Sequence, residues 1–131
     1  MRVIDASALG KYLNRENGWE KVEKFLMEGC ITIDLAFKEI ANMLWKRVKL
    51  KDLKEEQVIG LIEAFLNSGI LRVYPQNTLL KEALELSARL DMTVYDSLYV
   101  ILAKKLNVDL ITSDKLQAEK AITVGIRTLL V

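Results

Sequence analysis

The stretch VYDSLYVILAKKL, residues 94–106, has the residue spacing of an α-helix but almost no polar face on the helical wheel. A helix with this pattern is covered by other parts of the protein on most sides. It nevertheless carries Asp96, which shares a sector of the wheel with Tyr99. An unpaired carboxylate in such a place is strongly unfavourable, so we expect a functional partner for Asp96. The alternative is a capping box in which Thr93 pairs with Asp96.

On either side of this segment, short apolar runs alternate with longer segments of helical periodicity. The runs predict strands at residues 2–5, 30–33, 70–73, 109–112 and 126–130. The periodic segments predict helices at residues 7–13, 19–27, 35–48, 53–67, 78–90 and 115–121. Asp34 is the expected N-cap of the third of these helices, and Gly69 fits the position that ends the fourth. This order favours an α/β fold with a parallel sheet between helices, whose ligands bind beyond the carboxyl ends of the strands.

The composition restricts the possible chemistry. The chain has 131 residues, 51% of them hydrophobic, and a net charge of +1, which fits one domain spanning residues 1–131. The single cysteine, Cys30, excludes an intramolecular disulfide, and the absence of histidine excludes His-dependent triads and His-ligated metals. No segment has the pattern of an export signal or a membrane span, so we expect a protein of the reducing cytoplasm. Any general base or metal ligand must then be a carboxylate.

Two further acidic residues lie at the ends of predicted strands. Asp5 comes directly after Val3 and Ile4, and Asp114 follows the strand at residues 109–112. Parallel strands would bring both carboxylates to the same edge of the sheet, although each residue could instead serve only as a helix N-cap. Glu39 lies opposite the apolar face of its helix, so periodicity alone predicts an exposed side chain paired with a lysine.

Three carboxylates at one sheet edge repel each other, by about 4 kcal/mol per pair at about 4 Å with an effective dielectric near 20. A divalent cation would remove this repulsion, and all-oxygen ligands favour Mg²⁺ or Mn²⁺. Such an ion can activate water and stabilise a phosphate under attack, which points to phosphodiester hydrolysis. A haloacid-dehalogenase phosphatase is disfavoured because position 7 is Ser7, a two-component receiver because Asp5 has no acidic neighbour, and a P-loop or Rossmann site because the glycines do not cluster.

Four motifs resemble those of the PIN-domain nucleases, in the same order along the chain. They are VIDASAL at residues 3–9, EIANML at 39–44, YDSLY at 95–99 and LITSDKL at 110–116. The compact size resembles the VapC-type toxins of type II toxin–antitoxin systems. The resemblance implies a three-layer α/β/α sandwich with a central, mainly parallel sheet. It also implies a metal-dependent endoribonuclease whose acidic quartet is Asp5, Glu39, Asp96 and Asp114.

The resemblance also implies a role for each of these side chains. Asp5 and Asp96 hold the principal Mg²⁺ or Mn²⁺ ion, while Glu39 and Asp114 complete the pocket or bind a second ion. Three neighbouring polar residues orient the carboxylates or are candidates to do so, namely Ser7, Ser113 and Asn42. The chain departs from many relatives at Ser97, where alanine is common, and at Leu116 and Gln117, where some relatives carry a further Asp or Asn. The number of bound ions therefore stays open.

The resemblance further implies an RNA substrate, a homodimer and a small antitoxin whose C-terminal segment enters the acidic groove. The helices at residues 35–67 carry more apolar bulk than one small sheet face covers, so we expect the dimer or antitoxin contact there. The apolar residues are Phe37, Leu44, Trp45, Leu61 and Phe65, and a basic patch that could guide RNA is formed by Lys46, Arg47, Lys49, Lys51 and Lys54. The alternatives are a nuclease-silent PIN-like module that binds protein or RNA, and a PIN nuclease acting in RNA processing.

Overall fold

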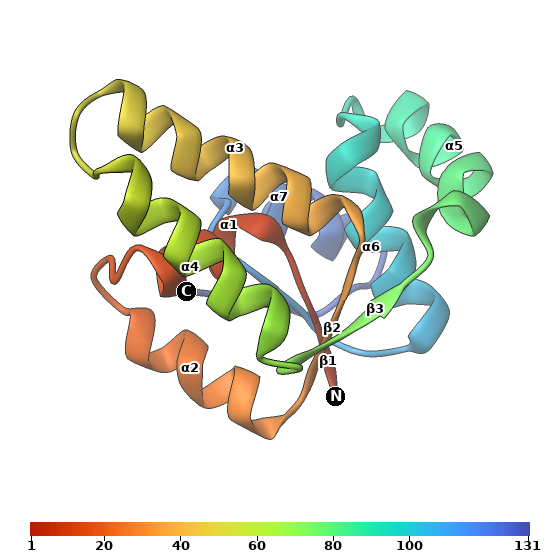
Figure 1. Ribbon diagram of the computed structural model, residues 1–131. Helices are drawn as coiled ribbons and strands as arrows, with labels where there is room; N and C mark the ends of the chain where they lie inside the picture. Colours follow the sequence, from red (N-terminus) through yellow and green to blue (C-terminus); the bar gives the residue numbers. More distant parts are fainter.

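Five short strands form one wholly parallel sheet in the computed structural model, which describes residues 1–131 (Figure 1). The strands are β1 (Arg2–Ile4), β2 (Cys30–Ile33), β3 (Leu71–Tyr74), β4 (Leu110–Thr112) and β5 (Thr128–Leu130). Their order in the sheet is β3-β2-β1-β4-β5, so β1 lies in the centre, with Val3 beside Ile31 of β2 and Leu110 of β4. The residues of β2 and β4 are buried throughout, as expected for parallel strands covered on both faces.

Helices cover both faces of this sheet, which gives the three-layer α/β/α arrangement expected from the sequence. They are α1 (Ala6–Leu13), α2 (Trp19–Glu28), α3 (Leu35–Lys49), α4 (Glu55–Asn67), the 3₁₀ helix η1 (Gln76–Leu79), α5 (Leu80–Leu90), α6 (Val94–Leu106) and α7 (Lys115–Thr123). Figure 1 shows α3 and α4 as a hairpin and α5 beside α6. No helix has both the length and the apolar character required to cross a membrane.

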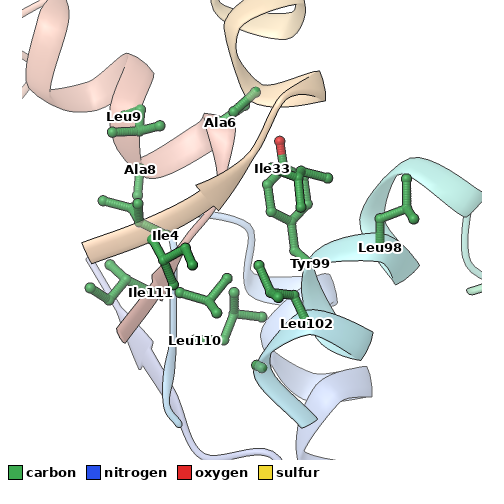
Figure 2. Packing of buried hydrophobic residues seen from close by; sticks show 14 of the residues in the cluster. Ile4, Ala6, Ala8, Leu9, Ile33, Leu98, Tyr99, Leu102, Leu110 and Ile111 are labelled. Atoms are coloured by element: carbon green, nitrogen blue, oxygen red, sulfur yellow. The ribbon is translucent and has the colours of Figure 1, made fainter. Parts of the chain in front are cut away.

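Helix α6 is the buried helix that its sequence predicts. It packs against β1, β2 and β4, and every residue from Ser97 to Ala103 is buried. Figure 2 shows the central strands between α1 and α6, with Leu102 and Leu110 in the apolar cluster and the hydroxyl of Tyr99 pointing away from Leu102. The absence of a polar face in this segment therefore reflects its place against the middle of the sheet.

The helix caps agree only in part with the sequence analysis. Gly69 has a φ of 65°, as expected for the residue that ends α4. Asp34 occupies the predicted N-cap position of α3, but its side chain makes no capping hydrogen bond to this helix. Its Oδ1 instead accepts a hydrogen bond from the backbone N–H of Gln76 at 3.0 Å. Asp34 thus connects the end of β2 to η1, a partner 42 residues away that local sequence does not indicate.

The strand order fixes where a ligand would bind. From β1 the chain passes to β2 on one side, while β4 pairs with the other side of β1. In open α/β sheets, the carboxyl ends of the strands at such a reversal form the binding crevice. Asp5 stands at this end of β1, and Ser113 and Asp114 follow β4 at the same edge.

Candidate active site

A pocket of about 280 Å³ lies at this edge and contains all four acidic residues that the resemblance singles out. Asp5 comes from the end of β1, Glu39 from α3, Asp96 from the first turn of α6 and Asp114 from the start of α7. The polar and ionisable residues that also line it are Ser7, Asn42, Lys46, Tyr99 and Gln117. Four segments distant in the sequence therefore contribute carboxylates to one surface depression.

Asp5 is the most buried acid of the pocket, with 2% of its surface exposed. Its Oδ1 accepts hydrogen bonds from Ser7 Oγ at 2.7 Å and from the backbone N–H of Ala8 at 3.0 Å, and its Oδ2 accepts one from Thr112 Oγ1. Each carboxylate oxygen has two lone pairs, so Oδ2 retains one acceptor site. Asp5 is therefore both the N-cap of α1 and a carboxylate that can take one further partner in the pocket.

The hydroxyls that hold Asp5 are themselves held by the turn after β4. Ser7 Oγ accepts a hydrogen bond from the backbone N–H of Ser113 at 2.9 Å, and Thr112 Oγ1 accepts one from the N–H of Asp114 at 3.0 Å. Ser7 thus bonds to the Asp5 carboxylate, and its role in orienting a metal ligand stays a prediction. The hydroxyl of Ser113 is buried without a hydrogen-bond partner, so this residue acts through its main chain and the expectation for its side chain is wrong.

Glu39 is not the exposed, lysine-paired residue that helical periodicity predicts. Its side chain is half-buried, and Oε1 accepts a hydrogen bond from Tyr99 Oη at 2.7 Å. The helix face that lies opposite the apolar stripe of α3 is the face that forms the pocket wall, where Asn42 and Lys46 also lie. The resemblance therefore located Glu39 better than periodicity did.

Asp96 and Asp114 both stand at helix N-termini. The backbone N–H of Asp96 donates to Thr93 Oγ1 at 3.2 Å, while no hydrogen bond from Thr93 N–H to the Asp96 carboxylate completes a capping box. Asp114 caps α7, because its Oδ1 accepts a hydrogen bond from Gln117 N–H at 3.0 Å. With Asp5 at the start of α1, three of the four acids lie where helix dipoles favour negative charge.

The electrostatics of the pocket disfavour full ionisation. Burial raises the pKa of Asp5 to about 6, against the lowering effect of its hydrogen bonds, and the charge of Asp96 adds to the rise. Burial also raises the pKa of Asp96, with the charge of Asp114 contributing, and the pKa of Glu39, with the charge of Asp96 contributing. None of the four carboxylates forms an ion pair with a lysine or arginine. The pocket therefore holds negative charge that no protein cation balances by direct contact.

The donor set suits a hard divalent cation. It consists of oxygens only, which are the ligands that Mg²⁺ and Mn²⁺ prefer. No group of three acidic side chains is arranged to hold a metal ion. Mg²⁺ does not require such a group, because it keeps several water ligands and is usually bound through one or two carboxylates. The free acceptor site of Asp5 Oδ2 and the uncompensated charge of the pocket fit this mode of binding.

Sequence reasoning missed three residues that shape the pocket. Tyr99 was noted to share one side of its helix with Asp96, three residues away, but no role in the pocket was predicted for it. Thr112 was noted only as part of a strand and a motif. Gln117 was noted only as a departure from relatives, although a glutamine that is 3% exposed in a short helix requires hydrogen-bond partners. For the last two, the missing signal is burial, which the sequence does not show for an isolated polar residue.

The parallel sheet and the acid-lined pocket at its reversal point define a protein of the PIN class. The PIN domain family matches residues 2–122, and the chain belongs to this family. Among its relatives is Ribonuclease VapC3 of Pyrobaculum aerophilum, which is 35% identical over 121 residues, with 90% of this chain and 92% of the relative covered.

Solved structures agree with this assignment at the level of the fold. PAE2754 from Pyrobaculum aerophilum superposes with a TM-score of 0.75 at 24% identity, over 97% of this chain and 82% of the other. VapC20 of Mycobacterium tuberculosis, described as a toxin that cleaves the sarcin-ricin loop, superposes with a TM-score of 0.73 at 14% identity and full coverage of both chains. At these identities the similarity establishes the three-layer fold, which confirms the fold class expected from the sequence.

Proposed function

We propose that this protein is a Mg²⁺- or Mn²⁺-dependent endoribonuclease and the toxin of a toxin–antitoxin pair. The observation that carries the proposal is the meeting of Asp5, Glu39, Asp96 and Asp114 in one pocket without a paired lysine or arginine. The similarity to a protein named Ribonuclease VapC3 supports RNA as the substrate. An RNA substrate and a single buried, free cysteine are compatible with activity in the cytoplasm.

Asp5 and Asp96 are the residues that would hold the principal ion, with Glu39 and Asp114 completing the pocket. When bound, the cation supplies positive charge to the reacting phosphate and acidifies water. Ser7 and Thr112 hold the Asp5 carboxylate in one orientation by donating to its two oxygens. Tyr99 does the same for Glu39. These donors favour the ionised form of each acid and thus oppose the protonation that burial promotes.

Lys46 is the only basic residue in the pocket wall, and it forms no ion pair. It lies on α3, one helical turn beyond Asn42 and two beyond Glu39. An ammonium group in this position can bind a phosphate of the RNA next to the one that is cleaved. Asn42 can donate to the same strand through its amide. Both residues therefore serve substrate binding in this proposal, and the acids serve hydrolysis.

The proposal is tested by incubating the purified protein with single-stranded and structured RNA, with Mn²⁺ or with excess chelator. We expect cleavage with Mn²⁺, none in chelator, and none in the Asp96→Asn variant under either condition. Cleavage that persists in chelator or in this variant would overturn the metal mechanism. Binding of Mn²⁺ or RNA without any cleavage would instead support the nuclease-silent module. Cleavage by a protein with which no antitoxin co-purifies would favour a role in RNA processing.

The expected partner site lies between α3 and α4. An apolar groove of about 420 Å³ is lined there by Leu44, Trp45, Val58, Ile59 and their neighbours, with Trp45 55% and Ile59 50% exposed. The Phe37 and Phe65 rings pack against each other with their centroids 5.8 Å apart and do not line this groove. We propose that an apolar segment of the antitoxin occupies it, and that a second copy of the chain is the competing occupant.

A charge in this groove separates the outcomes. The Trp45→Glu variant should lose binding of the antitoxin in a co-purification assay while RNA cleavage is retained, because the groove does not include the acids. Sedimentation of the wild type and the variant reports the oligomeric state at the same time. A variant that is monomeric where the wild type is a dimer would assign the groove to self-association, and unchanged assembly together with unchanged partner binding would contradict both uses.

A further inference from the structure

Gln117 is a buried neutral residue that contacts the surroundings of three acids of the pocket. It lies in the first turn of α7 and is 3% exposed. Its Nε2 donates a hydrogen bond to the main-chain oxygen of Asp96 at 3.2 Å, and its backbone N–H donates to Asp114 Oδ1 at 3.0 Å. Its Oε1 lies 3.2 Å from Thr112 Oγ1, the hydroxyl that donates to Asp5. One side chain therefore reaches from α7 to α6 and β4.

Two of the acidic residues repel each other where the N-terminal ends of α6 and α7 lie beside the pocket. Asp96 is on α6 and Asp114 is at the start of α7, and both side chains line the same pocket. Repulsion between these carboxylates favours separation of the two helix ends. An amide that donates to the main chain of Asp96 counteracts this separation without adding a charge. A lysine or arginine in its place would neutralise an acid that the proposed cation requires.

The Thr112 hydroxyl links Gln117 to the third acid. This hydroxyl has a single hydrogen and three oxygens within reach, namely Asp5 Oδ2, Gln117 Oε1 and Ser7 Oγ. Gln117 therefore offers an alternative acceptor for the hydrogen that Asp5 receives. If Asp5 turns its free lone pair toward a cation, the buried hydroxyl still has a partner, so no unsatisfied polar group is created.

We propose that Gln117 is a positioning residue that holds Asp96 and Asp114 at the separation at which the pocket binds a divalent cation. This inference rests on the proposed function for the identity of the ligand. It goes beyond that function because it makes Gln117 responsible for the distance between Asp96 and Asp114. Groups that orient metal-binding side chains typically change metal affinity by about 10- to 100-fold when removed. Loss of the Gln117 amide should therefore weaken cation binding while the fold is retained.

The test uses the Gln117→Met variant, because methionine has a similar length and volume but lacks the amide. Mn²⁺ binding is measured by calorimetry, and thermal unfolding is measured in chelator. We expect the variant to bind Mn²⁺ about tenfold more weakly than the wild type, or more weakly still. Its melting temperature in chelator should be close to that of the wild type. RNA cleavage should regain the wild-type kcat when Mn²⁺ is raised to saturation. The Glu119→Met variant, which places the same side chain at an exposed position of α7, is the control and should bind Mn²⁺ as the wild type does.

The outcomes separate this inference from the proposed function. Equal Mn²⁺ affinity of the wild type and the Gln117→Met variant would overturn the positioning role, and so would a kcat that stays low at saturating Mn²⁺. If the methionine variant does not fold, Gln117→Asn replaces it, because an amide one methylene shorter should lose the same contact. A wild type that binds Mn²⁺ without cleaving RNA would contradict the endoribonuclease and leave the test of Gln117 intact.

Discussion

Tyr99 Oη donates a hydrogen bond to Glu39 Oε1 at 2.7 Å, and this bond joins α6 to α3 across 60 residues of sequence. The Tyr99 side chain is 1% exposed, so the hydroxyl has no access to bulk water as an alternative partner. The bond favours the ionised form of Glu39, against the burial that raises the pKa of this residue. The orientation and the charge of one pocket acid thus depend on a residue of the core.

The Tyr99→Phe variant should therefore be less stable than the wild type at neutral pH. Removal of a hydrogen bond to a charged group costs about 1.5–3 kcal/mol, whereas the phenylalanine ring fills the same space. The difference should shrink in acid, where Glu39 is protonated in both proteins and its bond to Tyr99 is weaker. Urea unfolding of both proteins at neutral and acidic pH provides the measurement. The Tyr95→Phe variant, at a position 61% exposed on the same helix, should behave as the wild type.

The buried Asp5 should make the metal-free protein less stable as the pH rises. Its pKa is about 6 in the folded state and 3.8 as the ordinary value. Between these values the folded state binds a proton that the unfolded state has released. The protonated Asp5 carboxyl therefore stabilises the folded state fully at pH values below 3.8, and this stabilisation is lost as the pH rises through about 6. The loss is on the order of 3 kcal/mol for this carboxyl alone.

The Asp5→Asn variant should lack this pH dependence. Its amide oxygen can still accept from Ser7 and Ala8, and its NH₂ can donate to Thr112, whose hydroxyl can then donate to Gln117. Unfolding free energies of the two proteins in chelator, measured between pH 4 and 7, should diverge in favour of the variant as the pH increases. Parallel profiles would show that Asp5 is not the titrating group. Glu119→Gln, on α7, is the exposed control.

Asp96 should couple stability to divalent cations. The wild type should gain about 2.7 kcal/mol at a hundredfold excess of Mn²⁺ over Kd. The Asp96→Asn variant keeps the backbone N–H that Thr93 caps and loses a charge that Asp114 opposes. Its melting temperature in chelator should therefore equal or exceed that of the wild type, and its response to Mn²⁺ should be small. A destabilised variant beside a wild type that does not respond to Mn²⁺ would contradict the metal site.

Replacement of Lys46 by alanine should weaken RNA binding with little effect on the hydrolytic step. The KM should rise. The slope of the logarithm of RNA affinity against the logarithm of salt concentration should become shallower by about one, the value for one lost phosphate contact. RNA binding is measured by filter binding at several salt concentrations. All proteins in this assay also carry Asp96→Asn, which is expected to prevent cleavage, so that binding is measured alone. Lys104→Ala removes an exposed lysine near the end of α6, outside the pocket, and is the matched control. Equal salt slopes for all three proteins would exclude Lys46 from the RNA path.

The elements that local sequence controls were predicted well. The bounds of β2 and α6 agree with the predicted segments at residues 30–33 and 94–106, because continuous apolar runs and helical spacing mark them directly. The parallel sheet follows from the alternation of strands and helices and is confirmed. The order of the strands was not predicted, since it depends on which distant segments pair with β1.

The errors concern side chains whose partners are distant in the sequence. Asp34 has the pattern of an N-cap but bonds to Gln76, and Glu39 has the pattern of an exposed residue but bonds to Tyr99. In both cases a contact across 42 or 60 residues decides the orientation. The placement of Asp5 and Asp114 at one edge was predictable because parallel strands end there together. Their part in catalysis stays a prediction.

The central position of β1 has a consequence for biosynthesis. Residues 2–5 are translated before residues 110–112, so β1 gains its second neighbour, and Asp5 its Thr112 partner, only after residues 110–112 have been made. Until then one side of β1 is an open strand edge, and Asp114 and Gln117 do not exist. The pocket therefore cannot assemble on a nascent chain that stops short of α7. The pocket is thus completed only when two segments 107 residues apart, those of Asp5 and Thr112, have both been translated and have met.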